Sequence, residues 1–337
     1  MASSAASSIF EQGKLKVYSC EKTQNDASSP PKPLFIVTPT DQAGSYPVIL
    51  FLHGFCMRNC YYRQLLGQIA SHGYIVVAPQ LGFSPFPSAK GDVKPAASLA
   101  TNFSEHNCSS NEDIAAAAAV INWLPGALQS VLPSGVQANL RSLVLAGHSK
   151  GGHTAFALAM HKYATTSLDF SALVGIDPVA GAEVALGLQV PIPPRILTYE
   201  SNSFAINIPT LIVGSGLGEE RKMLILPPCA PKRLNHAEFF SESKPCSSYF
   251  VVKDYGHMDM LDDDVTEMAL IACMCGGGCR GKMRRTIAGL VVAFLEAYLD
   301  GKGEDLAAVV ADPSIAPATL DPVQQKLTGR MAAISRL

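Results

Sequence analysis

Ser149 is the residue of this chain that is best placed to act as a nucleophile. It stands in the run from Gly147 to Gly151, Gly-His-Ser-Lys-Gly, after four apolar residues and before small residues at helical spacing. This pattern predicts a strand, a tight turn and a helix, with the serine at the turn. The turn needs glycine on both sides, because a Cβ would collide with the strand or the helix. We therefore expect an exposed hydroxyl at a helix N-terminus, and a plain turn serine is the alternative.

A serine hydroxyl is a weak nucleophile at neutral pH, so Ser149 needs a general base. We expect His257 in this role, because it follows the last predicted strand on a glycine turn. A loop at that point can carry an imidazole over the strand ends. His153 and His161 lie in the helix after Ser149 and cannot easily turn back over its N-terminus. For His236 we expect a surface or capping role.

The base needs an acid that orients it, and Asp177 is the best candidate. It stands at the C-terminal tip of the strand that follows the predicted turn and helix. Glu219, which follows the next strand, is the alternative, but it does not stand at the tip itself. The acidic run at 262–264 lies too close to His257 along the chain, and we expect it to cap the next helix.

Ester or amide chemistry at a serine also needs two backbone N–H groups that bind the oxyanion. We expect one from Lys150, directly after the nucleophile, and one from Phe55 in the loop after His53 and Gly54. Cys56 is the alternative for the second donor. The side chains of the histidines in these two motifs are expected to be structural.

The elements around these residues predict one α/β domain. Continuous apolar runs are typical of strands that helices cover on both faces, and helical patterns separate the runs here. The expected architecture is the α/β-hydrolase fold, a single doubly wound, mainly parallel sheet with helices on both faces. The predicted strands are 34–37, 47–52, 74–78, 143–146, 172–176, 210–213 and 249–252, and the predicted helices include 61–72, 111–123 and 284–298.

The domain is expected to span 34–303. Residues 1–33 are interpreted as an N-terminal tail with an edge strand near 15–20, and 304–337 as a C-terminal extension. The Ser/Ala-rich N-terminus fits a disordered tail better than the start of a plastid transit sequence. Residues 81–111 are rich in Pro, Ser and Asn and are interpreted as a lid or loop insert.

The composition narrows the function classes. The chain has 337 residues, of which 48% are hydrophobic and 16% charged, so it can bury a large core. Its net charge of −2 gives no basic surface for nucleic acid. We expect no transmembrane segment, because no apolar run is long enough. The nine cysteines favour reduced thiols, with one local disulfide as the alternative, and no metal site is expected.

Several motifs together resemble the plant chlorophyllases. The likeness extends from about residue 12 to 323, and Lys150 departs from it where that family more often has arginine. The motifs that carry the resemblance are HGF at 53–55, ASHGYIVVAPQ at 70–80, GHSKGGHTAFALA around Ser149, GIDPVAG at 175–181, ILTYE at 196–200, GSGLGEE at 214–220 and KDYGHMDMLDDD at 253–264.

The resemblance implies hydrolysis of the ester that joins phytol to chlorophyll, without a cofactor, by Ser149, Asp177 and His257. It also implies chlorophyll as the partner, peripheral membrane association and a chloroplast location, with the cytosol or another membrane surface as the alternative. Phe83, Phe86 and Met258 are candidate substrate contacts, and core packing is an equal alternative for them. The competing functions are a lipase or carboxylesterase of the platelet-activating-factor-hydrolase type and a non-catalytic receptor.

Overall fold

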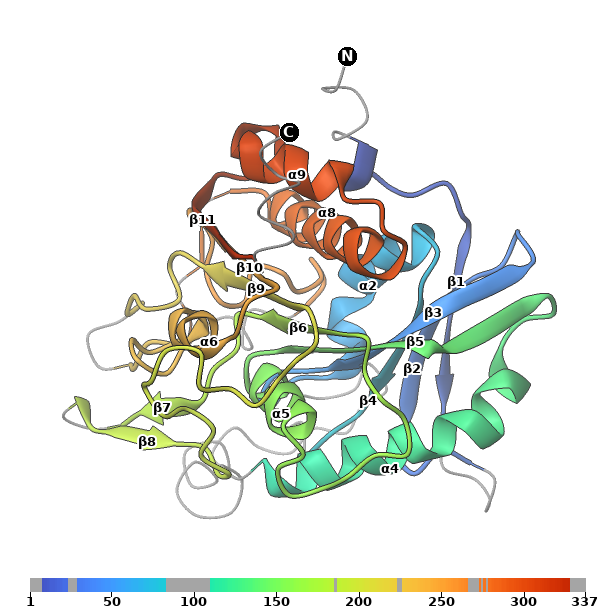
Figure 1. Ribbon diagram of the computed structural model, residues 1–337, viewed down its shortest axis with the longest axis horizontal. Coiled ribbons are helices and arrows are strands. Elements are labelled where there is room, and N and C mark those ends of the chain that lie inside the picture. The colour runs from blue at the N-terminus through green and yellow to red at the C-terminus, as the bar shows by residue number, and fades with distance from the viewer. Residues whose placement is uncertain are drawn as a thin grey trace.

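A nine-stranded sheet forms the centre of the computed structural model, which describes residues 8–23, 29–82, 110–184, 187–222, 226–265, 273, 275–276 and 278–327. The six central strands run parallel, and the remaining three pair antiparallel at the two edges of the sheet (Figure 1). In spatial order the strands are β1 (Val17–Lys22), β2 (Leu34–Pro39), β4 (Ile75–Pro79), β3 (Gly44–Leu52), β5 (Val136–His148), β6 (Ala172–Ile176), β9 (Thr210–Ser215), β10 (Ser247–Val252) and β11 (Leu320–Lys326).

Helices cover both faces of this sheet (Figure 1). Alternate residues of one strand serve the two layers, as Ile49 packs in one core cluster and Leu50 in the other. The expected α/β-hydrolase fold is therefore confirmed. The helices of the first layer are α2 (Arg63–Ser71), α8 (Arg280–Leu299) and α9 (Glu304–Ala311), and those of the second are α4 (Asn111–Ala127), α5 (Lys150–Ala159) and α6 (His236–Glu242).

Several elements differ from the sequence expectation, among them β5, β11 and α6. β5 begins at Val136, inside a stretch without a predicted strand, and its first half is mostly part-exposed and lacks an apolar run. β11, with the sequence LDPVQQK, is a polar edge strand, so its composition carries no strand signal. α6 is a short helix of seven residues in a segment for which the sequence predicted no helix.

Both segments outside the expected 34–303 domain contribute to the same fold. β1 pairs with β2, and Ile9 and Phe10 are buried, so this part of the expected tail belongs to the sheet and its core. The expected C-terminal extension supplies α9 and β11. Most of the expected insert at 81–111, namely 83–109, lies outside the described residues.

Cys229 and Cys273 form a disulfide, which corrects the expectation of reduced thiols. The partners are 44 residues apart, so local spacing gave no sign of the pairing. The described residues contain no group of three or more His, Cys, Asp or Glu that could hold a metal ion.

The stretch Asn111–Val131, which contains α4, is long and apolar enough to cross a membrane by length and composition. No segment of this kind is expected from the sequence. Its residues Ile114, Ala117 and Ile121 are buried in the core cluster beside the sheet. The helix thus packs one face against the sheet.

The packing of Phe10 against α8 gives a first prediction. Phe10 is 1% exposed and lies against α8 at Gly289, where an added Cβ would come within 2.3 Å of the Phe10 ring. Phe10→Ala should lower the free energy of unfolding by about 3–5 kcal/mol, because it empties a packed site. Urea denaturation measures this change. The control Tyr18→Ala alters a side chain that is 52% exposed and should change stability by less than about 0.5 kcal/mol. Equal effects of the two variants would contradict the anchoring.

Candidate active site

Ser149 occupies a strained turn between β5 and α5. Its φ is 57° and its ψ is −125°, which is unusual for a residue with a side chain. A Cβ on Gly147 would lie 2.3 Å from the Gly151 carbonyl oxygen, and one on Gly151 would lie 2.1 Å from that of Leu52. The Ser149 N–H donates to the Ile176 carbonyl at 3.1 Å, which joins the turn to the end of β6. The two glycines therefore permit the close approach that the sequence predicted.

Ser149, His257 and Asp177 form one continuous hydrogen-bonded chain. His257 Nε2 lies 2.8 Å from Ser149 Oγ, and His257 Nδ1 lies 2.7 Å from Asp177 Oδ2. Ser149, His257 and Asp177 follow the C-terminal ends of β5, β10 and β6. These ends lie on the same side of the sheet, because the strands are parallel. The structure thus brings together the three residues that the sequence singled out. This is the arrangement in which an imidazole can take a proton from a serine hydroxyl.

The Asp177 carboxylate is fully buried and surrounded by donors. Its Oδ1 accepts a hydrogen bond from the Ser215 N–H at 3.2 Å, and its Oδ2 accepts one from the Ser215 hydroxyl. Burial alone raises the pKa of Asp177, but the hydrogen bond and charge of His257 and the neighbouring His236 and Ser215 outweigh it, so that the pKa is lowered. Asp177 is therefore ionised at neutral pH.

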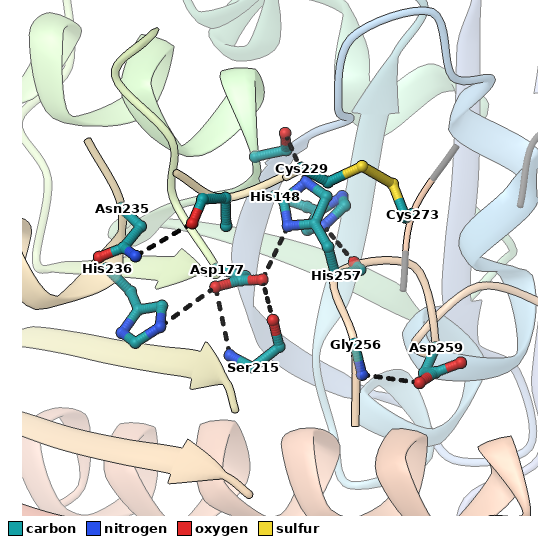
Figure 2. A network of polar contacts seen from close by, with 12 residues as sticks. His148, Asp177, Ser215, Cys229, Asn235, His236, Gly256, His257, Asp259 and Cys273 are labelled. Atoms are coloured by element: carbon teal, nitrogen blue, oxygen red, sulfur yellow. Dashed lines mark hydrogen bonds and ion pairs between the residues drawn. A yellow bond between two sulfur atoms is a disulfide. The ribbon is translucent and has the colours of Figure 1, made fainter. Parts of the chain in front are cut away.

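His236 is a residue whose role the sequence analysis missed. It is 6% exposed, where a surface or capping position was expected. Its Nδ1 lies 2.8 Å from the Tyr249 hydroxyl, and its Nε2 points to Asp177 Oδ1 at 3.7 Å, on the side of the carboxylate away from His257 (Figure 2). The helix α6 directs the ring inward, and its cap is the preceding Asn235, which accepts from the Ala237 N–H.

The alternative acids lie elsewhere. Glu219 Oε1 accepts a hydrogen bond from Asn235 at 2.8 Å, and Asp177 holds the position next to His257. In the acidic run, Asp262 Oδ1 accepts from the Gln64 N–H at 2.8 Å, so it binds the N-terminus of α2. The residues that follow the run, 266–272, lie outside the described part of the chain, so the expected cap of the next helix stays a prediction. Asp263 binds Arg284 of α8 at 2.7 Å. The run therefore links the loop after β10 to two helices of the first layer.

The loop after β3 lies against the serine turn. An added Cβ on Gly54 would come within 3.2 Å of Ser149 Cβ, so Phe55 and Cys56 follow a close contact with Ser149. Lys150 Nζ lies 2.9 Å from Asp113 Oδ2 and 5.6 Å from the centroid of the Phe55 ring. These contacts hold together the two segments from which oxyanion donors are expected.

A second series of hydrogen bonds connects this loop to His257. The Gly54 N–H donates to the Tyr62 hydroxyl at 3.1 Å, and that hydroxyl lies 2.8 Å from His148 Nδ1. Because the His257 carbonyl can only accept, His148 Nε2–H donates to it at 3.0 Å. In the neutral ring Nδ1 then accepts from the Tyr62 hydroxyl. Burial first, and then the charge of His257, lower the pKa of His148 well below its usual range, so the ring is neutral.

The expected substrate contacts divide into two groups. Phe83 and Phe86 lie outside the described residues. Met258 is 4% exposed and packs in the core cluster that contains α2 and α8, which fits the core-packing alternative.

His153 gives a prediction about pH. Its Nδ1 lies 3.2 Å from Ser110 Oγ and its Nε2 lies 3.1 Å from the Pro194 carbonyl, and burial lowers its pKa from 6.5 to about 4. The unfolded chain binds a proton at this group below pH 6.5 and the folded chain does not. Stability is therefore lost as the pH falls from about 6.5 toward 4, by about 3 kcal/mol for this group.

The measurement is urea denaturation at pH 7 and pH 4 for the wild type and His153→Gln. The wild type should lose about 3 kcal/mol more than the variant between these values. The exposed His161, at the end of the same helix, supplies the control His161→Gln, which should behave as the wild type. If the free energy of unfolding falls by the same amount between pH 7 and pH 4 in the wild type and in His153→Gln, His153 is not held neutral.

Comparison with known proteins places this chain in a family. The chlorophyllase family model matches residues 5–108 and 101–327. Chlorophyllase-1 of Arabidopsis thaliana is 44% identical over 93% of this chain and 91% of its own length. Chlorophyllase-2 of Arabidopsis thaliana is 40% identical (91% and 93%), and the chloroplastic chlorophyllase-1 of Citrus unshiu is 41% identical (94% and 88%). The resemblance noted from the sequence motifs is confirmed, and this chain belongs to the chlorophyllase family.

Proposed function

We propose that this protein is a chlorophyllase, a carboxylic-ester hydrolase that cleaves the phytyl ester of chlorophyll to chlorophyllide and phytol. The observation that carries the proposal is the imidazole of His257 between the Ser149 hydroxyl and the Asp177 carboxylate. Family membership selects the substrate class, since several curated relatives are named chlorophyllases.

In this mechanism Ser149 is the nucleophile, His257 the base and Asp177 the orienting acid. His257 Nε2 takes the hydroxyl proton as Ser149 Oγ bonds to the ester carbonyl carbon. When the tetrahedral intermediate collapses, the bond to the phytyl oxygen breaks and His257 protonates the leaving phytol. Water, deprotonated in turn by His257, then releases chlorophyllide from the acyl-enzyme. Asp177 stays ionised and stabilises the imidazolium.

The N–H groups of Lys150 and Phe55, with Cys56 as the alternative to Phe55, are the proposed oxyanion donors. Removal of one such donor costs about 3–4 kcal/mol of transition-state stabilisation in comparable sites. We propose no cofactor for the reaction, and the magnesium of chlorophyll belongs to the substrate. The relatives from Citrus are named chloroplastic, which supports a chloroplast location, where the protein would associate peripherally with membranes that hold the pigment.

The two competing functions make different demands. A receptor that only binds needs no aligned base, yet the Ser149–His257–Asp177 chain is continuous here. A general lipase or carboxylesterase would use the same three residues, so only the substrate separates it from a chlorophyllase.

The substrate test compares chlorophyll with a short p-nitrophenyl ester. We expect the wild type to release phytol from chlorophyll, and both Ser149→Ala and Asp177→Asn to lower kcat by about 10⁴-fold or more. Ser167→Ala, at an exposed position, is the control and should keep full activity. Turnover of the short ester without release of phytol would favour the carboxylesterase.

The series of hydrogen bonds from Gly54 through Tyr62 and His148 to His257 gives a separate prediction. Tyr62→Phe keeps the ring but leaves the Gly54 N–H and His148 Nδ1 without their partner. Because this loosens both the oxyanion loop and the base, kcat should fall about tenfold with little change in KM, on either ester. Tyr46→Phe removes a hydroxyl that binds the Gln42 carbonyl at 2.8 Å, away from the site, and should leave kcat unchanged. An unchanged kcat for Tyr62→Phe would exclude this positioning role.

A further inference from the structure

The hairpin of β7 (Gly181–Glu183) and β8 (Gln189–Pro191) turns an apolar face outward. Ala182 pairs with Val190 in the register, and the Val184 N–H donates to the Leu188 carbonyl at 2.8 Å. Since side chains alternate along a strand, these four residues share one face. Val184, Leu188 and Val190 are 44%, 65% and 42% exposed. Figure 1 shows the hairpin projecting from the body of the protein.

The opposite face of the hairpin is polar and holds it to the protein. Glu183 forms an ion pair with Arg221, and Gln189 Nε2 donates to the Lys232 carbonyl at 2.7 Å. A strand on the surface of a soluble domain has the reverse order, with apolar residues inward and polar residues outward. The hairpin therefore uses its polar side chains for attachment and leaves its apolar ones available.

This concentration of apolar surface is unusual for the molecule. Of the six large hydrophobic side chains that are exposed in the described part of the chain, the three aliphatic ones all lie on this face, and the others are tyrosines. Scattered single residues need no explanation, but a contiguous apolar face indicates a contact.

The neighbouring segment has the chemistry of a membrane interface. Lys232, whose carbonyl binds the hairpin, and Arg233 are both exposed. The Arg233 guanidinium lies 5.0 Å from the ring centroid of Tyr199, which is 47% exposed. Basic side chains and tyrosine flank the apolar part of proteins that lie on lipid headgroups, where they meet anionic lipids and the interfacial region.

We propose that the outward face of this hairpin, Ala182, Val184, Leu188 and Val190, docks on the surface of a lipid bilayer. This inference rests on the proposed function, because a phytyl ester partitions into lipid. A face formed by four side chains is small beside the roughly 800 Å² per partner of a stable protein interface, whereas a lipid surface requires no complementary shape.

The position of the hairpin connects this docking to the site. The strand β7 begins shortly after Asp177, and the intervening Val179 N–H donates to the Ser149 carbonyl at 3.2 Å. The Ala180 N–H donates to the Leu234 carbonyl at 2.7 Å, which connects the start of the hairpin to the segment that contains Lys232 and Arg233. Docking through the hairpin therefore brings the bilayer to the same end of the sheet as the nucleophile.

The test is co-sedimentation with vesicles of phosphatidylcholine alone and with added phosphatidylglycerol. The variant Val184→Thr/Leu188→Gln/Val190→Thr keeps the shape of the hairpin and removes its apolar character. We expect its binding to both kinds of vesicle to be weaker than that of the wild type by about tenfold or more. The control Tyr18→Ser/Tyr163→Ser alters exposed rings outside the hairpin and should bind as the wild type.

Activity assays separate this proposal from the proposed function. The hairpin variant should hydrolyse a water-soluble p-nitrophenyl ester and detergent-dispersed chlorophyll at the wild-type rate, and chlorophyll in vesicles about tenfold more slowly. Wild type that binds vesicles but releases no phytol in any form would refute the chlorophyllase activity alone. Equal vesicle binding by the wild type and the hairpin variant would overturn the docking site. A wild-type dimer that the variant dissociates in sedimentation velocity would also overturn it, in favour of a second copy.

Discussion

A carboxylate without access to water is stable as an anion only if hydrogen-bond donors or positive charges replace its hydration. Asp177 meets this condition through Ser215 on β9, His257 after β10 and His236 on α6. The same contacts fix the direction of the His257 ring and thus the distance of 2.8 Å between Nε2 and Ser149 Oγ. The alignment of His257 with the Ser149 hydroxyl therefore depends on how the buried Asp177 carboxylate is compensated.

The sheet supplies the rigid frame for this compensation. The parallel strands β5, β6, β9 and β10 end at the same edge, so residues far apart in the chain meet there without long loops. The chain of Gly54, Tyr62 and His148 crosses the same edge and reaches the His257 backbone. His257 is thus held both through its side chain, by Asp177, and through its carbonyl, by His148.

Much of this arrangement was predictable because strands with buried, apolar residues leave a clear signal. Ser149 and Asp177 stand directly at the ends of such strands, and His257 follows another on a short turn, so the topology determines where they lie. His236 gave no such signal, since its importance arises from the direction in which the short helix α6 points its ring. The pairing of Cys229 with Cys273 and the edge strand β11 depend on contacts between distant segments, which neither spacing nor hydrophobic pattern reveals.

The central claim, that the His257–Asp177 pair activates the Ser149 hydroxyl, is tested most directly with a fluorophosphonate probe and peptide mass spectrometry. In this reaction the serine oxygen bonds to phosphorus and fluoride leaves, so only an activated hydroxyl reacts quickly. The account predicts one adduct, on the peptide that contains Ser149, and its near absence in folded His257→Gln. No adduct on the wild type, or labelling of His257→Gln at the wild-type rate, would contradict it.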